Sequence, residues 1–282
     1  MRYGVAFLCR RYRVSRSGFY AWLARDGSPR RRNDQALGER IEAIYRDSGE
    51  RYGSPRVHEV LMKQGIRCSN KRVARLMRER RLRARASRLY RNGSGRVRQF
   101  FAKTDNLRLQ EPLPTRLDQI WVGDLTYLRL GKRWRYLATV MDLFSRRIVG
   151  WTLSRHRTTE VTLRALKRAI DARHPRPGLM FHSDRGIEYS AYGYQDFLKL
   201  YGIVPSMNRP RHCQDNAHME SFFHSLKAEL THRRNYASDA ELNASVARYI
   251  DRFYNDKRIH SSLGYHSPVE FERLAYASQS VH

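Results

Sequence analysis

Three carboxylates in the second half of the chain have the residue type and the spacing of a divalent-metal site. Asp124 lies within Trp121–Tyr127, Asp184 lies within His182–Gly186, and 35 residues separate Asp184 from Glu220. Carboxylates that are held close together repel one another, and their pKa values rise. A divalent cation removes that cost, and hard oxygen ligands select Mg²⁺ or Mn²⁺. We therefore expect Asp124, Asp184 and Glu220 to be both metal ligands and catalytic residues.

A site of this composition suits phosphodiester chemistry on DNA. Two metal ions about 3.5–4 Å apart activate the attacking oxygen and stabilise the leaving oxygen of an in-line displacement. No protein nucleophile is needed. We expect water to free a 3′-hydroxyl first, and that hydroxyl to attack a second phosphodiester.

Apolar periodicity predicts the elements that would position these carboxylates. The expected strands are 119–130, 134–144, 147–153, 179–181 and 203–206. The expected helices are 158–173, 190–201, 214–230, 238–255 and 266–276. Three strands followed by alternating helices and strands are typical of a ribonuclease-H-like α/β core, which is a mixed five-stranded sheet with helices.

In this order of elements the first strand is central and the fourth strand lies beside it. Asp124 in the first strand and Asp184 at the end of the fourth are then neighbours in the sheet. Glu220 enters from the helix 214–230. Asn216, His224 and Lys227 share its helical face and are the DNA contacts that we expect there.

Five side chains near these motifs are expected to have structural roles. Asp215 precedes the Glu220 helix and is expected to cap it. His182 is expected to pack or to hydrogen-bond near the site without binding metal. Trp121, Trp134 and Trp151 are expected in the core.

The charge of the chain indicates a polyanionic partner. Its 282 residues include 55 Lys+Arg and 27 Asp+Glu, a net charge of +28. Residues 1–117 carry +20 of that excess and residues 118–282 carry +8. A surplus of this size is typical of nucleic-acid-binding proteins, so the N-terminal part is predicted to hold double-stranded DNA.

The N-terminal part is predicted to contain two helical DNA-binding units. A helix capped by Ser15 and another that begins after Ser69 are expected, and residues 27–32 have the composition of a linker. The predicted organisation is a helix-turn-helix-like segment at 1–32, a second helix-turn-helix-like DNA-binding domain at 33–80, a basic linker at 81–117, the catalytic core at 118–235 and a helical extension at 236–282. The expected DNA contacts on the basic helix are Lys71, Arg72, Arg75 and Arg78.

The cysteine pattern and the hydropathy exclude other classes. Cys9, Cys68 and Cys213 are far apart and form no C-x-x-C pair, so neither a disulfide framework nor a zinc knuckle is expected. No apolar stretch approaches the roughly 18 residues of a membrane span. We expect a cytoplasmic protein that acts on the nucleoid.

Together the motifs closely resemble the second-frame (OrfB) transposases of insertion-sequence family three. The catalytic spacing is similar to the D-D-35-E pattern of the wider transposase and retroviral-integrase superfamily. The motifs that carry the resemblance lie at 15–20, 52–58, 121–127, 142–147, 182–186, 215–227, 254–255, 260–265 and 267–268. It covers nearly the whole chain.

The resemblance implies a function and further site residues. It implies metal binding by the three carboxylates, 3′-end cleavage and strand transfer at terminal inverted repeats, and movement by copying through a circular intermediate. Lys227 would contact DNA near the cut, and Ser15, Arg16, Ser17 and Arg56 lie in the motifs expected to bind DNA. Because two ends must be joined, a homo-multimer on DNA is expected.

Two departures from the family pattern leave alternatives open. Glu188 stands where members often have Gln, and an extra carboxylate there would perturb metal binding. The active enzyme of the family is usually a frameshift fusion with an upstream frame, whose leucine-zipper heptads this chain lacks. An upstream-frame protein is therefore an expected partner. The alternatives are a DNA-binding regulator or inactive partial product, and a phage or retroelement integrase; a retroviral type is disfavoured because no His-His-Cys-Cys zinc module is present.

Overall fold

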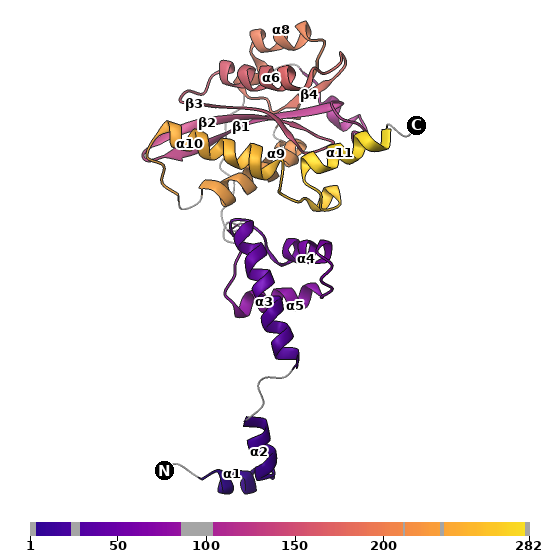
Figure 1. The fold of residues 1–282 in the computed structure, drawn as a ribbon. Coiled ribbons are helices and arrows are strands. Elements are labelled where there is room, and N and C mark those ends of the chain that lie inside the picture. The colour runs from indigo at the N-terminus through magenta and orange to yellow at the C-terminus, as the bar shows by residue number, and fades with distance from the viewer. Residues whose placement is uncertain (1–3, 24–28, 86–103, 211, 232–233, 280–282) are drawn as a thin grey trace. The chain divides into compact units, whose positions relative to one another are not determined.

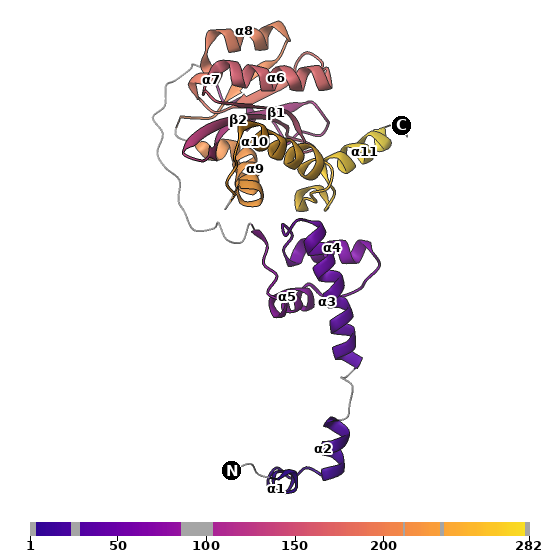
Figure 2. The ribbon, with the colours of Figure 1, turned by 60° about the vertical axis from the view of Figure 1, so that its left-hand side comes forward.

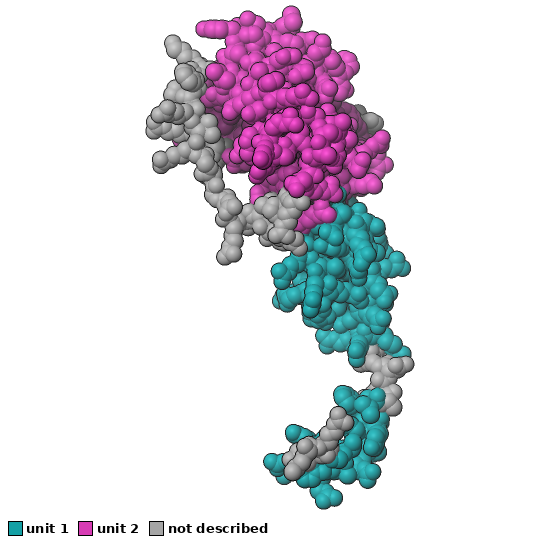
Figure 3. Space-filling view, turned by 90° about the vertical axis from the view of Figure 1, so that its left-hand side faces the viewer, with its two compact units in different colours: residues 1–84 teal, residues 85–282 magenta. Residues whose placement is uncertain are grey.

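The computed structural model describes residues 4–23, 29–85, 104–210, 212–231 and 234–279. The chain divides into two compact units, Met1–Ala84 and Arg85–His282 (Figure 3). Residues 236–279, predicted as a separate extension, belong to the same unit as the catalytic core. None of the described helices is both long enough and apolar enough to cross a membrane.

The first unit is helical. Its helices are α1 (Val5–Arg11), α2 (Arg16–Leu23), α3 (Pro29–Asp47), α4 (Ser54–Lys63) and α5 (Asn70–Glu79). Apolar side chains of α3, α4 and α5 make a small core, in which Ile41, Leu61 and Val73 are fully buried. Gly65 turns the chain between α4 and α5 with a φ of 78°, a conformation that glycine adopts without strain.

Local capping explains where two of these helices begin. The Ser69 hydroxyl accepts a hydrogen bond from the Arg72 backbone N–H at 3.2 Å, and the Ser15 hydroxyl accepts one from the Gly18 N–H at 3.0 Å. Both predicted caps are therefore confirmed.

The predicted linker at 27–32 is wrong for residues 29–32, because α3 begins at Pro29. Proline suits the first turn of a helix, where its missing N–H has no intrahelical partner. Residues 27 and 28 lie outside the described part of the chain.

The second unit is built on one five-stranded sheet with the order β3-β2-β1-β4-β5. The strands are β1 (Ile120–Leu130), β2 (Arg133–Asp142), β3 (Ile148–Ser154), β4 (Met180–Ser183) and β5 (Val204–Met207). The first three are antiparallel, whereas β4 pairs parallel with β1 and with β5. The mixed sheet with a central first strand is confirmed.

Helices cover both faces of this sheet (Figures 1 and 2). On one face lie α6 (Thr159–Arg173) and α8 (Tyr192–Leu200); on the other lie α9 (Ala217–Leu226) and α10 (Asp239–Ala247). Two expected helices, 214–230 and 238–255, are each divided, because π-helical turns at Lys227–Thr231 and Arg248–Tyr254 follow α9 and α10. A short helix that was not expected, α7 (Ile187–Ser190), precedes α8. The last described helix is α11 (Pro268–Gln279).

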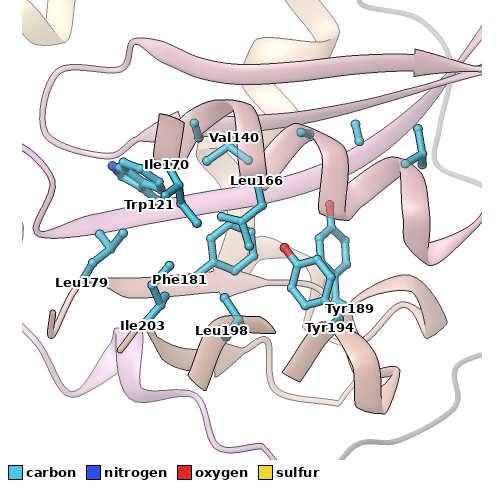
Figure 4. Close-up of a cluster of buried hydrophobic side chains, with 14 of the residues drawn as sticks. Trp121, Val140, Leu166, Ile170, Leu179, Phe181, Tyr189, Tyr194, Leu198 and Ile203 are labelled. Carbon is cyan, nitrogen blue, oxygen red and sulfur yellow. The ribbon is translucent and has the colours of Figure 1, made fainter. Parts of the chain in front are cut away.

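The main core lies between the sheet and α6 with α8, and it fixes the strand that carries Asp124 (Figure 4). Trp121 and Phe181 are buried there with Leu166 of α6. A Cβ on Gly123 would lie 2.4 Å from the Phe181 ring. Glycine at that position therefore lets Phe181 pack against β1 directly beside the candidate site.

Two of the three tryptophans expected in the core are not fully buried. Trp121 is buried as predicted, and its Nε1 donates to Asp118 at 2.9 Å. Trp151 is only partly buried, and Trp134 is 48% exposed, so core placement is wrong for Trp134. Trp134 lies near the β1–β2 turn, and periodicity in the sequence does not show where the cover of a sheet ends.

Candidate metal and DNA site

The register of two parallel strands brings Asp124 next to Asp184. Val122 of β1 is paired with His182 of β4. The same register, continued by two residues, sets Asp124 opposite Asp184. Because β4 ends at Ser183 while β1 continues to Leu130, the two carboxylates lie where the neighbouring strand stops.

Backbone N–H groups orient both carboxylates. Asp124 Oδ1 accepts a hydrogen bond from the Leu125 N–H at 2.7 Å, and Asp184 Oδ1 accepts one from the Gly186 N–H at 3.0 Å. Hydrogen bonds of this kind stabilise the ionised carboxylate. Each carboxylate is thus held through one oxygen.

Burial and mutual repulsion act against ionisation of the pair. Burial raises the pKa of Asp124 well above its usual value, and the charges of Asp184 and then Glu220 raise it further, while Lys227 opposes the shift. The pKa of Asp184 is also raised, mainly by burial and then by the charge of Glu188. The sequence predicts this rise in pKa for carboxylates held close together, and a bound cation would offset the repulsion between them.

Glu220 is less closely gathered than the two aspartates. It is exposed in the first turn of α9, although its charge acts on Asp124. Across the described ranges, no three His, Cys, Asp or Glu side chains stand in a metal-holding group. The charge of Glu220 reaches Asp124, but the three carboxylates do not form a closed metal-binding group in the described part of the chain.

Asn216 supplies an independent sign that the site suits a cation. Its side chain is 3% exposed, and Nδ2 donates to the Gly123 carbonyl at 3.1 Å, next to Asp124. Its Oδ1 is buried and has no hydrogen-bond partner in the part of the chain that the structure describes. A buried acceptor without a partner is costly unless a ligand satisfies it. The oxygen-rich donors present thus fit a hard divalent cation.

The predicted DNA-facing helical surface is divided in the structure. Glu220 and His224 are exposed on α9, whereas Asn216 precedes the helix and is buried. Lys227 begins the π-helical turn and is half-buried, with Nζ 4.3 Å from the centre of the Tyr127 ring. Burial lowers the pKa of Lys227, and the charge of Asp124 opposes that shift.

His182 is held entirely within the protein. Its Nδ1 lies 2.9 Å from the Ser206 hydroxyl and its Nε2 lies 2.7 Å from Asn208 Oδ1. Burial lowers its pKa to about 4. Both ring nitrogens thus form hydrogen bonds within the protein, which link β4 to β5 and to the loop that follows it. His182 therefore has the packing and hydrogen-bonding role that was predicted.

The expected cap by Asp215 is wrong. Its carboxylate accepts hydrogen bonds from Arg209, at 2.9 Å to the backbone N–H, and from Asn106 Nδ2 at 2.7 Å. The residue at the start of α9 is Asn216, whose side chain makes no capping bond. Asp215 instead ties the loop after β5 to residue 106.

Sequence reasoning missed Arg157. Glu188 is 2% exposed, and its carboxylate accepts from Arg157 Nε at 2.5 Å and Nη2 at 3.2 Å. A Cβ on Gly186 would lie 2.8 Å from Glu188 Oε2 and 2.9 Å from Asp184 Oδ1, so both carboxylates flank one glycine. The only signal in the sequence was the unusual Glu188, because a buried carboxylate needs a cationic partner.

The predicted DNA contacts of the first unit have unequal surroundings. Arg72 and Arg75 each lie 2.6 Å from the Asp34 carboxylate of α3. Lys71 and Arg78 are exposed on the same helix. Ser15, Arg16 and Ser17 are also exposed, and Arg56 is half-buried over the Tyr52 ring at 5.8 Å.

Comparison with known proteins agrees with this architecture. Models described as "Integrase core domain" match residues 114–213 and 201–268, and a model described as "HTH-like domain" matches residues 32–90. The transposase InsF for insertion sequence IS3A of Escherichia coli (strain K12) is 38% identical over 272 residues, which cover 96% of this chain and 94% of InsF. The insertion element IS600 uncharacterized 31 kDa protein of Shigella sonnei is 36% identical, over 94% of this chain and 97% of its own length.

The fold and the matched domains define the class as an integrase-core polynucleotidyl transferase with a helix-turn-helix-like DNA-binding domain. More narrowly, the chain belongs to the transposases of the IS3 family of insertion sequences.

Solved structures resemble the chain more weakly. The HTLV-2 integrase catalytic core domain is 19% identical with a TM-score of 0.41, covering 55% of this chain and 97% of that one. The catalytic core domain of BIV integrase is 18% identical with a TM-score of 0.42, covering 58% and 99%. At such scores, the fold assignment rests on the strand order and on the family.

Proposed function

We propose that this transposase cleaves the 3′ ends of its insertion sequence at terminal inverted repeats and transfers them to target DNA, with two Mg²⁺ ions held by Asp124, Asp184 and Glu220. Mn²⁺ would substitute. The observation that carries the proposal is the β1–β4 register, which sets Asp124 beside Asp184 where β4 ends. The buried Oδ1 of Asn216, which has no hydrogen-bond partner among the described residues, supports it.

When bound, the metal ions would activate the attacking oxygen and stabilise the leaving oxygen. The protein contributes orientation and charge. The N–H groups of Leu125 and Gly186 hold the two aspartates, so that their free oxygens keep a fixed direction. Lys227 interacts electrostatically with Asp124. Its ammonium group supplies a positive charge that can bind a DNA phosphate near the metal ions.

Arg157 has a supporting role in this proposal. Its guanidinium is anchored by the buried Glu188 and lowers the pKa of Asp184 through its charge, partly offsetting burial and Glu188. The extra carboxylate is therefore neutralised by a partner in the same chain, and it does not stand as a competing metal ligand.

We propose further that the enzyme acts as a homo-multimer on double-stranded DNA, in the cytoplasm where bacterial DNA lies, and with an upstream-frame protein or as a fusion to it. Two element ends must be brought to two active sites for joining. Light scattering of the chain with and without its end DNA would measure the assembly. A monomer on paired ends would contradict it.

The test of the reaction is Mg²⁺-dependent nicking of DNA that flanks the gene. Asp184→Asn keeps the side-chain oxygen that accepts from Gly186 but removes the charge, so cleavage should fall about a thousandfold or more. The matched control is Asp196→Asn, whose carboxylate is exposed on α8 and pairs with Lys199 at 3.4 Å. Undiminished cleavage by Asp184→Asn would overturn the proposal, and DNA binding without cleavage by the wild type would favour a regulator.

A further inference from the structure

Two large aromatic side chains are exposed together on the β1–β2 hairpin. Tyr127 is 56% exposed and Trp134 is 48% exposed. Their ring centres are 5.1 Å apart, with the planes at 85°. This edge-to-face contact leaves ring surface open to solvent. Paired exposed aromatics of this kind mark binding surfaces.

The aromatic pair and the candidate metal site share one neighbour, Lys227. Tyr127 lies three residues after Asp124, on the part of β1 that extends beyond its pairing with β4. Lys227 Nζ lies 4.3 Å from the centre of the Tyr127 ring, and the same Lys227 acts electrostatically on Asp124. One cation therefore links the carboxylates to the aromatic pair.

The surroundings of the pair are positively charged. No acidic residue occurs between Asp124 and Asp142, whereas the hairpin carries Arg129, Lys132, Arg133 and Arg135. The first three are exposed around the turn. Aromatic rings interleaved with exposed cations complement a single-stranded nucleic acid, which offers phosphates and unpaired bases.

Packing within the hairpin does not account for this arrangement by itself. Cross-strand aromatic pairs do stabilise hairpins. However, the residues directly opposite are Tyr136 for Tyr127 and Arg129 for Trp134, so the two rings meet diagonally. A purely structural pair gains stability from burial, and here about half of each side chain stays in solvent.

We propose that Tyr127 and Trp134 form a stacking platform for an unpaired DNA base beside the phosphodiester that is cut or joined. The inference rests on the proposed DNA cleavage and adds a binding site to it. Base–aromatic stacking tolerates any base, and unstacking a nucleotide next to the reacting phosphate gives the metal site access to it.

Binding in EDTA tests the platform without cleavage. The probes are a short duplex with a single-stranded thymine tail and the same duplex with blunt ends. Wild-type protein should bind the tailed duplex about tenfold more tightly, which is the size of one stacking contact. The double variant Tyr127→Ala with Trp134→Ala should lose that preference and keep its affinity for the blunt duplex.

Matched variants separate stacking from other losses. Tyr127→Phe keeps the ring and should keep the preference, as should Tyr276→Ala, which removes a comparably exposed tyrosine (53%) from α11. With 5-iodouracil in the tail, irradiation should cross-link Tyr127 or Trp134, identified by mass spectrometry. No preference in the wild type, or an equal preference in the double variant, would overturn the platform.

The outcomes separate the two proposals. Absence of a tail preference in the wild-type protein, together with intact Mg²⁺-dependent nicking, would remove the platform and leave the catalytic proposal standing. Tail preference and cross-linking without nicking by the wild type would leave the platform standing and remove the catalytic proposal.

Discussion

The two units of this transposase place their charged side chains differently. In the catalytic unit, Arg258 and Glu229 form a buried ion pair at 3.0 Å. In the N-terminal unit, Arg72 and Arg75 pair with Asp34, and their side chains are 35% and 38% exposed. The same residue types thus form a buried pair in the catalytic unit and a partly exposed cluster in the N-terminal unit. The net charge of the chain predicts charged side chains on the surface, but it does not predict a buried ion pair.

Removing one partner from each kind of ion pair should give the largest difference between the units. Glu229→Gln leaves buried Arg258 without a counter-charge and weakens the acceptor of the Tyr249 hydroxyl, so we expect a loss of about 3–5 kcal/mol in unfolding free energy. Asp34→Asn should cost much less than Glu229→Gln, because the Asp34 partners are partly hydrated.

Urea denaturation of the full chain, followed by probes in each unit, would measure both changes. A control is Asp196→Asn, whose ion pair is fully at the surface. Equal losses for Glu229→Gln and Asp34→Asn would show that the units do not differ in this respect.

Asp124 and Asp184 of the candidate site are partly buried and raise each other's tendency to bind protons, which predicts a pH-dependent metal affinity. The pKa values of Asp124 and Asp184 are raised, above all by burial, so protons compete with the metal below those values. Affinity for Mn²⁺ should rise with pH, about tenfold per unit for each proton displaced, and level off above the raised pKa values.

Calorimetry in buffers of different ionisation enthalpy would count the released protons. Asp184→Asn should release fewer protons and bind more weakly. Metal affinity that does not change between acidic and neutral pH would contradict the coupling between Asp124 and Asp184.

The smallest effects are expected on the basic helix of the N-terminal unit. Lys71→Ala and Arg78→Ala should each lower the slope of log affinity against log salt by about 1, because each removes one exposed cation from DNA phosphate. Arg72→Ala should change it less, since Asp34 already pairs with that side chain. Titration of duplex DNA at several salt concentrations measures these slopes, and a flat response would exclude phosphate binding by this unit.

The sequence was sufficient for features that depend on local pattern and element order. The strand through Asp124, the cap at Ser69 and the central place of β1 follow from periodicity and known connections. Contacts made by tertiary packing could not be predicted. Arg157 reaches Glu188 across 31 positions, and Arg72 reaches Asp34 across 38. Nothing in the sequence around these residues indicates which distant residue each arginine contacts.

Gly123 is a position in β1 where a substitution would affect two parts of the protein. Its missing side chain is the space that the Phe181 ring fills, and its carbonyl receives the Asn216 amide. One residue therefore serves both the hydrophobic core and the candidate site. Any replacement there is expected to weaken folding and DNA cleavage together.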